Sequence, residues 1–359
     1  MSSQGQGQSS GGMPPQSTNT SSQHQGPPYL PTNAGLGGRP TPSVDDPISG
    51  VLLAFFIAGA VLNMTIFQLN RRRSHKFILS GLLFGFCMAR IVANVLRIVW
   101  ASYPNNAQIA IAAQVFANAG VVILFVVNLI FAQRILRAYH PQIGWSKPAT
   151  LLFRFFIASV IATLIMLIVA VVYNFYTLDH HIKQQIRDIQ LTASTYFAVL
   201  AFLPLPTIAL CFVLPRKAQM DKFGQGRMRT KIALLVFTSV ILTLGAAFRA
   251  GVAYKIRPVT NPAWYHHKAC FYCFNYVIEL IVVYLYALSR FDRRFHIPNG
   301  SHGPGAYSNS VKSDQPMYRV NTETEVFGED ERPEVLEQQR RQEREWEASH
   351  KSELDNETV

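Results

Sequence analysis

The sequence predicts an all-α fold, a polytopic membrane bundle of seven transmembrane helices with its N-terminus outside and its C-terminus in the cytosol. Of the 359 residues, 49% are hydrophobic and only 15% are charged. The apolar residues gather in seven runs, each of which reaches or approaches the ~20 residues needed to cross a bilayer. Lys and Arg are concentrated after alternate runs, and their distribution predicts the orientation.

Residues 1–46 are rich in Gln, Ser, Gly and Pro and contain almost no large apolar side chains. This composition predicts a disordered extracytoplasmic tail. We expect no signal peptide, because no basic region followed by an apolar core is visible at the start. Asn19-Thr20-Ser21 matches the acceptor pattern for N-glycosylation, so Asn19 is a candidate site if this end lies outside.

The membrane domain is predicted over residues 47–296. The second span is retained despite Arg90 and Arg97, because the rest of it is apolar; without it, both chain ends would lie on one side of the membrane. Pro204 and Pro206 predict a kink in the fifth span. The loops are short, so sequential helices should be antiparallel neighbours. The predicted spans are 47–69, 77–101, 107–133, 151–176, 189–214, 232–254 and 269–289.

The orientation follows from the charges of the loops. The segments after the first, third, fifth and seventh spans carry 16 Lys or Arg residues, and the opposite side carries six. The six are Arg39, Lys183, Arg187, Lys255, Arg257 and Lys268. Because cytosolic loops carry the excess of basic residues, the side with 16 is predicted to be cytosolic.

Residues 297–359 are predicted to be an acidic, disordered cytosolic tail, with 7 basic against 14 acidic residues. The basic loop 215–231 and this tail are candidate sites for a cytosolic partner or for anionic lipid. We expect membrane lipids as partners and no nucleic acid, because the basic residues lie at the ends of apolar runs.

Polar side chains inside the spans fall on single helical faces. Arg90, Asn94 and Arg97 follow one stripe of the second span, and Asn275 and Glu279 share a face of the seventh. Asn118 in the third span and Arg249 in the sixth add to this set. A helix with one polar stripe turns that stripe to the bundle interior, away from lipid.

Depth suggests which of these residues meet. At 1.5 Å per residue, Arg90 lies ~20 Å from the cytosolic start of its span and Glu279 ~15 Å from the outer surface. We therefore predict an intramembrane ion pair between Arg90 and Glu279. We also predict a positively charged cavity, open to the outside, for an anionic headgroup or carboxylate ligand. Its lining is predicted to be Asn94, Arg97, Asn118, Arg249 and Asn275.

The alternative is structural. Buried amides and hydroxyls often tie helices together by hydrogen bonds of about 1 kcal/mol each. Arg97 and Arg249 would then extend to the outer headgroups. A double-mutant cycle on Arg90 and Glu279 separates a true pair from two independent residues.

Signatures of enzymes are missing from the sequence. It has no phosphate-binding loop of the GxxxxGK[ST] type, no GxSxG elbow and no HExxH pair. The paired histidines at 180–181 and 266–267 have no set of Cys or carboxylate companions. We expect neither an enzyme nor a bound metal or cofactor.

Two segments resemble a known family. CFYCFNYVIELIVVYLYALSRFDRRFHIPNG at 270–300 and, more weakly, LNRRRSHKF at 69–77 resemble a fungal family of seven-span proteins catalogued as a domain of unknown function. The resemblance covers about residues 45–300, and it implies the fold but assigns no functional residues. In span count and orientation the chain is also similar to fungal lipid-translocating exporters of the drug-resistance type.

The sequence therefore predicts an integral, multi-pass protein of the plasma membrane or an endomembrane. We expect a receptor-like or sensor function, centred on the polar cavity around Glu279 and Arg90. The alternative is a transporter or lipid translocator for an anionic or amphipathic small molecule. The motifs of a G-protein-coupled receptor are not found, and the seventh span has no lysine for retinal.

Overall fold

The computed structural model describes residues 26–29, 33–72, 77–215, 220–221, 223–298, 300–301 and 303–309. Within these residues the chain is mainly helical, and its β-pairing is limited to one isolated bridge between Asn33 and Pro258. Seven helical segments are long and apolar enough to span a membrane, as predicted. They are Pro42–Arg72, Ile78–Ser102, Ala107–Tyr139, Lys147–Asn174, His180–Val213, Met228–Tyr254 and Lys268–Leu288.

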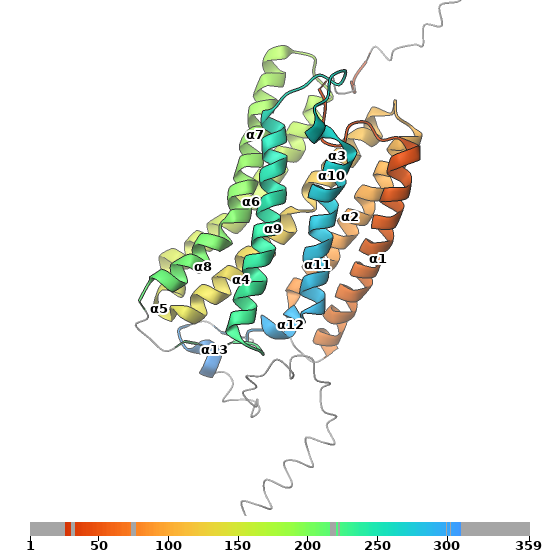
Figure 1. Cartoon of the computed structure of the whole chain (residues 1–359). Helices are drawn as coiled ribbons and strands as arrows, with labels where there is room; N and C mark the ends of the chain where they lie inside the picture. Colours follow the sequence, from red (N-terminus) through yellow and green to blue (C-terminus); the bar gives the residue numbers. More distant parts are fainter. Residues whose placement is uncertain are drawn as a thin grey trace, which may run out of the picture.

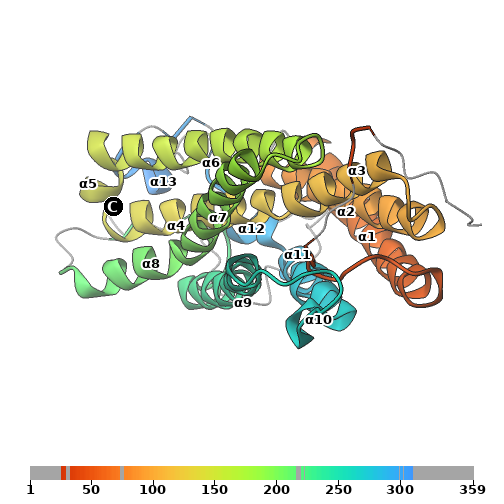
Figure 2. The same cartoon turned by 90° about the horizontal axis from the view of Figure 1, so that it is seen from above.

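The helices run side by side along a common direction (Figure 1). Seen from above, α1 and α2 lie at one side of the bundle and α5 and α8 at the other (Figure 2). We call the end at which α1 begins the proximal end and the end at which it finishes the distal end. The helices are α1 Pro42–Arg72, α2 Ile78–Ser102, α3 Ala107–Ala119, α4 Val122–Tyr139, α5 Pro141–Gly144, α6 Lys147–Asn174, α7 His180–Phe202, α8 Pro204–Val213, α9 Met228–Tyr254, α10 Lys268–Tyr272, α11 Ile278–Leu288, α12 Phe291–Arg294 and α13 Ala306–Asn309.

Two of the seven spans are interrupted. The fifth changes from α7 to α8 at Leu203, directly before Pro204, so the predicted kink is confirmed. The third changes from α3 to α4 at Gly120 and Val121. A Cβ on Gly120 would lie 3.2 Å from Nε of Arg90, so glycine leaves room for the guanidinium at this break.

The seventh span contains a π-helical turn. Residues Cys273–Val277 connect α10 to α11 with this wider hydrogen-bonding pattern. The turn packs against α9, where the carbonyl oxygen of Phe274 would lie 3.0 Å from a Cβ on Gly245. Single π-turns inside α-helices are frequently found at functional sites, because they re-aim side chains.

Four helices begin at least four residues earlier than hydropathy predicts, α6 and α9 by four residues each and α1 and α7 by more. α1 starts at Pro42 rather than at residue 47, because Pro is favoured in the first turn and Asp45 accepts a hydrogen bond from the Thr41 backbone N–H at 2.8 Å. α7 starts at His180 rather than at residue 189, and Asp179 caps it by accepting from the His181 N–H at 2.8 Å. Residues 33–46 therefore belong to the folded part and not to a disordered tail.

The distal end is closed by aromatic packing. The rings of Phe131 and Phe295 stack at 4.0 Å, and Tyr286 and Phe291 pack against them, all fully buried. The predicted disordered region after residue 297 also contains a short folded piece, α13, whose Tyr307 is buried.

A distal cap, which we define as residues 220–221, 223–227 and 303–309, covers this aromatic core. The rings of Trp145 and Phe223 each lie 5.6 Å from the ring of Tyr307. The Tyr307 N–H donates to Asp221 Oδ2 at 3.2 Å, and the Asp221 N–H donates to the Ala138 carbonyl at 2.9 Å. The cap thus joins part of the basic loop predicted as a partner site to the C-terminal segment.

Candidate functional site: a basic vestibule above a buried ion pair

The proximal half of the bundle contains a large cavity, which we call the vestibule. Its volume is about 1470 Å³, and its walls come from α2, α3, α7, α9, α10 and the segment that precedes α1. No Asp or Glu is among the described residues that line it. Seven basic residues do line it: Arg39, Arg97, Lys183, Arg187, Arg249, Lys255 and Lys268. A concave surface of one charge sign concentrates counter-ions of the opposite sign.

The early start of α7 supplies one wall of the vestibule. Lys183, Arg187 and Gln190 stand at i, i+4 and i+7, so they share one helical face, and all three line the cavity. Sequence reasoning assigned Lys183 and Arg187 to a loop. The i, i+4, i+7 spacing after the capping residue Asp179 was the signal that could have placed them on a helix.

Below the vestibule, Arg90 of α2 and Glu279 of α11 form the predicted ion pair. Arg90 Nη2 donates to Glu279 Oε1 at 2.6 Å, and Arg90 Nε lies 2.6 Å from Oε2. The side chains are 0% and 1% exposed. Arg90 Nη1 also donates to the Ala117 carbonyl at 2.7 Å, next to the break between α3 and α4. That carbonyl is available because the last carbonyls of a helix have no partner within it.

Arg249 of α9 connects the vestibule to this pair. Its Nη1 lies 3.4 Å from Glu279 Oε1 and donates to Asn275 Oδ1 at 3.1 Å. Its side chain remains 18% exposed, and both Arg249 and Asn275 line the vestibule. Arg249 is therefore the floor of the vestibule, since it contacts the cavity on one side and a buried carboxylate on the other.

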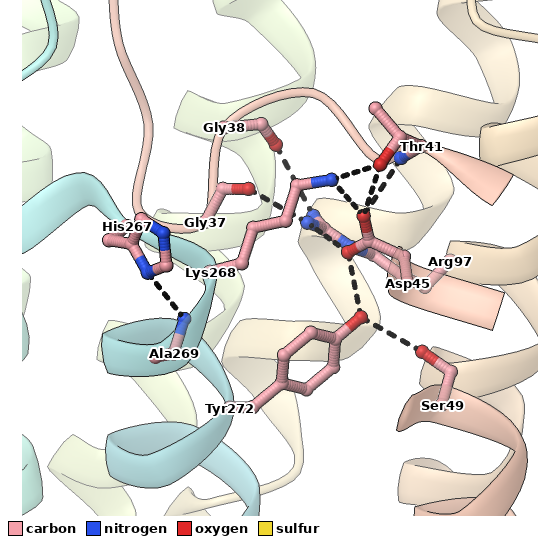
Figure 3. A network of polar contacts seen from close by, with 10 residues as sticks. All are labelled: Gly37, Gly38, Thr41, Asp45, Ser49, Arg97, His267, Lys268, Ala269 and Tyr272. Atoms are coloured by element: carbon pink, nitrogen blue, oxygen red, sulfur yellow. Dashed lines mark hydrogen bonds and ion pairs between the residues drawn. The ribbon is translucent and has the colours of Figure 1, made fainter. Parts of the chain in front are cut away.

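A second buried carboxylate, Asp45 of α1, lies near the proximal end (Figure 3). Arg97 donates to Asp45 Oδ1 from Nε at 3.0 Å and from Nη2 at 2.8 Å. Lys268 pairs with Oδ2, and the Tyr272 hydroxyl donates to Oδ1 at 2.7 Å. Ser49 lies 3.0 Å from the Tyr272 hydroxyl, so this network ties α1 to α2 and α10.

The Asp45 network corrects the alternative in which Arg97 extends to the headgroups. Arg97 is 5% exposed, and Nη2 also donates to the Gly37 carbonyl at 2.9 Å. Sequence reasoning missed Asp45 because the predicted first span began after it. The helix-start signal of Thr41 and Pro42 could have placed this carboxylate on α1, one turn inside the bundle.

Two predicted asparagines have different positions. Asn118 lines the vestibule, and its amide donates to the Gln114 carbonyl at 2.9 Å. Asn94 does not line the vestibule, because it is fully buried and its amide donates to the carbonyl of Arg90 at 2.8 Å. The candidate glycosylation residue Asn19 lies outside the described residues.

About two helical turns after Glu279, Tyr286 of α11 makes a third set of polar contacts. The Tyr286 hydroxyl donates to Asn128 Oδ1 at 2.6 Å and lies 2.8 Å from Thr238 Oγ1. The Asn128 amide donates to Ser239 Oγ at 3.0 Å. This cluster joins α4, α9 and α11 between the ion pair and the distal aromatic core.

His266 lines the vestibule close to its mouth and is 4% exposed. Its Nδ1 accepts from the Ala263 N–H at 3.3 Å, and its Nε2 has no hydrogen-bond partner among the described residues. Burial lowers the pKa of His266 below its ordinary value. Its Nε2 is therefore available for a ligand in the vestibule.

Together these features form an anion-binding geometry. Lys and Arg offer donors to oxyanions, and the lining contains no carboxylate among the described residues to compete with a ligand. The buried Arg90–Glu279 pair lies beneath this surface and is itself screened from the cavity.

Comparison with known proteins found a family match for one part of the chain. Residues 222–296 match the family described as "Protein of unknown function (DUF3112)". The match covers α9 to α12 and includes Arg249, Asn275 and Glu279, whereas the 69–77 junction lies outside it. No curated protein and no solved structure matches the chain.

Proposed function

We propose that this chain is a receptor-like or sensor protein that binds an anionic small molecule or headgroup in the vestibule. The observation that carries the proposal is a cavity of about 1470 Å³, lined by seven basic residues, whose floor residue Arg249 also contacts the buried Glu279. Ligand cavities in helical bundles have this form, a concave site with convergent polar groups. The proposed role is binding and signalling, without catalysis.

The proposed mechanism starts at Arg249. Its contact with Glu279 is 3.4 Å long, compared with 2.6 Å for Arg90, so a bound anion competes first for Arg249. When Arg249 moves toward the anion, Glu279 loses one of its two cationic partners and Asn275, in the π-turn, loses a hydrogen bond. In this mechanism α11 shifts in response, and its shift alters the contacts of Tyr286 and the packing at the distal end. A ligand shifts such an equilibrium only by its different affinity for the two states.

The orientation belongs to this proposal. With the 16 basic loop residues in the cytosol, the vestibule opens to the outside and the distal cap faces the cytosol. A cytosolic partner would then bind at loop 215–231 and the C-terminal tail. The membrane of residence, the fungal origin of the family and the likeness to lipid-translocating exporters stay predictions from the sequence.

The second candidate is a transporter or lipid translocator for an anionic or amphipathic small molecule. It is supported by the depth of the vestibule, which reaches the floor residue Arg249 beside a membrane-buried ion pair. The packed rings of Phe131, Tyr286 and Phe295 favour the sensor, because they leave the distal half closed in this conformation.

Uptake of radiolabelled phosphate into proteoliposomes separates the two candidates. The sensor proposal predicts phosphate binding to the reconstituted chain, with uptake no faster than in empty liposomes. If uptake exceeds the background and Arg249→Gln abolishes this excess, the transporter proposal is supported and the sensor proposal is wrong. If phosphate, pyrophosphate and tripolyphosphate all fail to bind, both candidates fail.

A further inference from the structure

The basic residues of the vestibule lie in two tiers. Arg249 forms the floor, and Lys255 stands six residues later at the end of α9, about 9 Å higher at 1.5 Å per residue. Lys183 and Arg187, one turn apart on α7, line the wall formed by this neighbouring helix, which packs against α9. An elongated ligand with more than one anionic group can reach both tiers.

The charge balance shows how many negative charges the vestibule can accept. Glu279 is shared by Arg90 and Arg249, and Asp45 is shared by Arg97 and Lys268, so each carboxylate leaves one positive charge in excess. No carboxylate among the described residues pairs with the four other lining cations, Arg39, Lys183, Arg187 and Lys255. A monovalent anion would leave most of this excess charge unbalanced.

The neutral lining fits an oxyanion as well. Gln114, Asn118 and Gln190 present side-chain amides among the lining residues. His266 adds a buried ring nitrogen, Nε2, without a partner among the described residues. Several donors around several cations match a ligand that carries many oxygen atoms, because each anionic oxygen accepts more than one hydrogen bond.

From these observations we infer that the vestibule binds a soluble multivalent oxyanion of the polyphosphate or organic phosphate class. This inference rests on the proposed anion-binding function and specifies its ligand. Arg249 and Lys255 lie about 9 Å apart along α9, so two anionic groups of one elongated ligand can be bound together. The second group adds attraction that a single phosphate lacks.

Calorimetric titration with inorganic phosphate, pyrophosphate and tripolyphosphate tests the inference. The full chain is held in neutral-lipid nanodiscs at constant ionic strength. We expect the dissociation constant to fall at least tenfold from phosphate to tripolyphosphate. The double variant Arg187→Gln/Lys255→Gln should remove this gain, so that its dissociation constants for the three anions lie within about threefold of one another. Arg154→Gln, an exposed cation of α6 outside the vestibule, is the matched control and should change nothing.

The outcomes separate this inference from the proposed function. Equal affinity for the three anions overturns the multivalent ligand and leaves the anion sensor standing, whereas the absence of binding by all three overturns both. A parallel titration in nanodiscs that contain phosphatidic acid tests the source of the phosphate group. If the anionic lipid abolishes tripolyphosphate binding in these nanodiscs, the vestibule binds lipid headgroups, and the inference of a soluble ligand is wrong.

Discussion

Neutralising Glu279 should destabilise the bundle more than any other single charge removal at the floor. In Glu279→Gln two guanidinium groups lose their counter-charge, that of Arg90 at 0% exposure and that of Arg249 at 18%. Removing one partner of a buried ion pair costs about 3–5 kcal/mol, because an uncompensated charge remains in the interior. Arg90→Leu should cost less, because Glu279 keeps Arg249 as its partner.

The assay is thermal unfolding of the detergent-solubilised protein. For a domain of this size about 1 kcal/mol shifts Tm by roughly 2–4 °C, so a cost of about 3 kcal/mol lowers Tm by roughly 6–12 °C. The double variant Glu279→Gln/Arg90→Leu should lie closer to wild type than the sum of the single changes, by at least about 1 kcal/mol. Asp188→Asn, which neutralises an exposed carboxylate of α7, is the control and should shift Tm little.

A drop below about 2 °C for Glu279→Gln would refute this reasoning. Such a result would mean that water or lipid headgroups already screen the pair. Strict additivity in the double variant would show that Arg90 and Glu279 do not stabilise each other.

Three further predictions follow from other parts of the molecule. Asp45→Asn leaves Arg97 and Lys268 without their shared carboxylate and should lower stability by about 3 kcal/mol, measured by the same thermal assay; an unchanged Tm would contradict the network of Figure 3. Tyr307→Ala removes the ring between Trp145 and Phe223 and should speed amide exchange in residues 223–227 but not in the vestibule. Because burial lowers the pKa of His266, the unfolded chain binds its proton more readily, so stability should decline as pH falls below about 6.5, and this decline should be smaller in His266→Gln.

The seven spans and the central ion pair could be predicted from the sequence. Hydropathy and length identify membrane helices reliably, because backbone groups in lipid must be satisfied within a helix. The partners Arg90 and Glu279 could be matched because helical rise converts residue number into depth. The kink at Pro204 followed from the missing N–H of proline.

The remainder of the site could not be read from hydropathy. Asp45 and the first turns of α7 are polar, so an apolar window ends before them, although capping residues extend both helices. The break at Gly120 lies beside Arg90 and the π-turn beside Arg249, and neither leaves a periodic signal in the chain. The seven lining cations converge only because four helices, α2, α7, α9 and α10, and the segment before α1 bring their proximal ends together.

The central claim is that ligand binding in the vestibule changes the structure of the distal end, and that Glu279 mediates this effect. Amide hydrogen exchange of the full chain in nanodiscs, with and without tripolyphosphate, tests it most directly. We expect exchange to change both at the vestibule and in residues 223–227, and the double variant Arg90→Leu/Glu279→Gln to retain the first change and lose the second. A change confined to the vestibule in the wild-type protein, despite saturating ligand, would contradict the account.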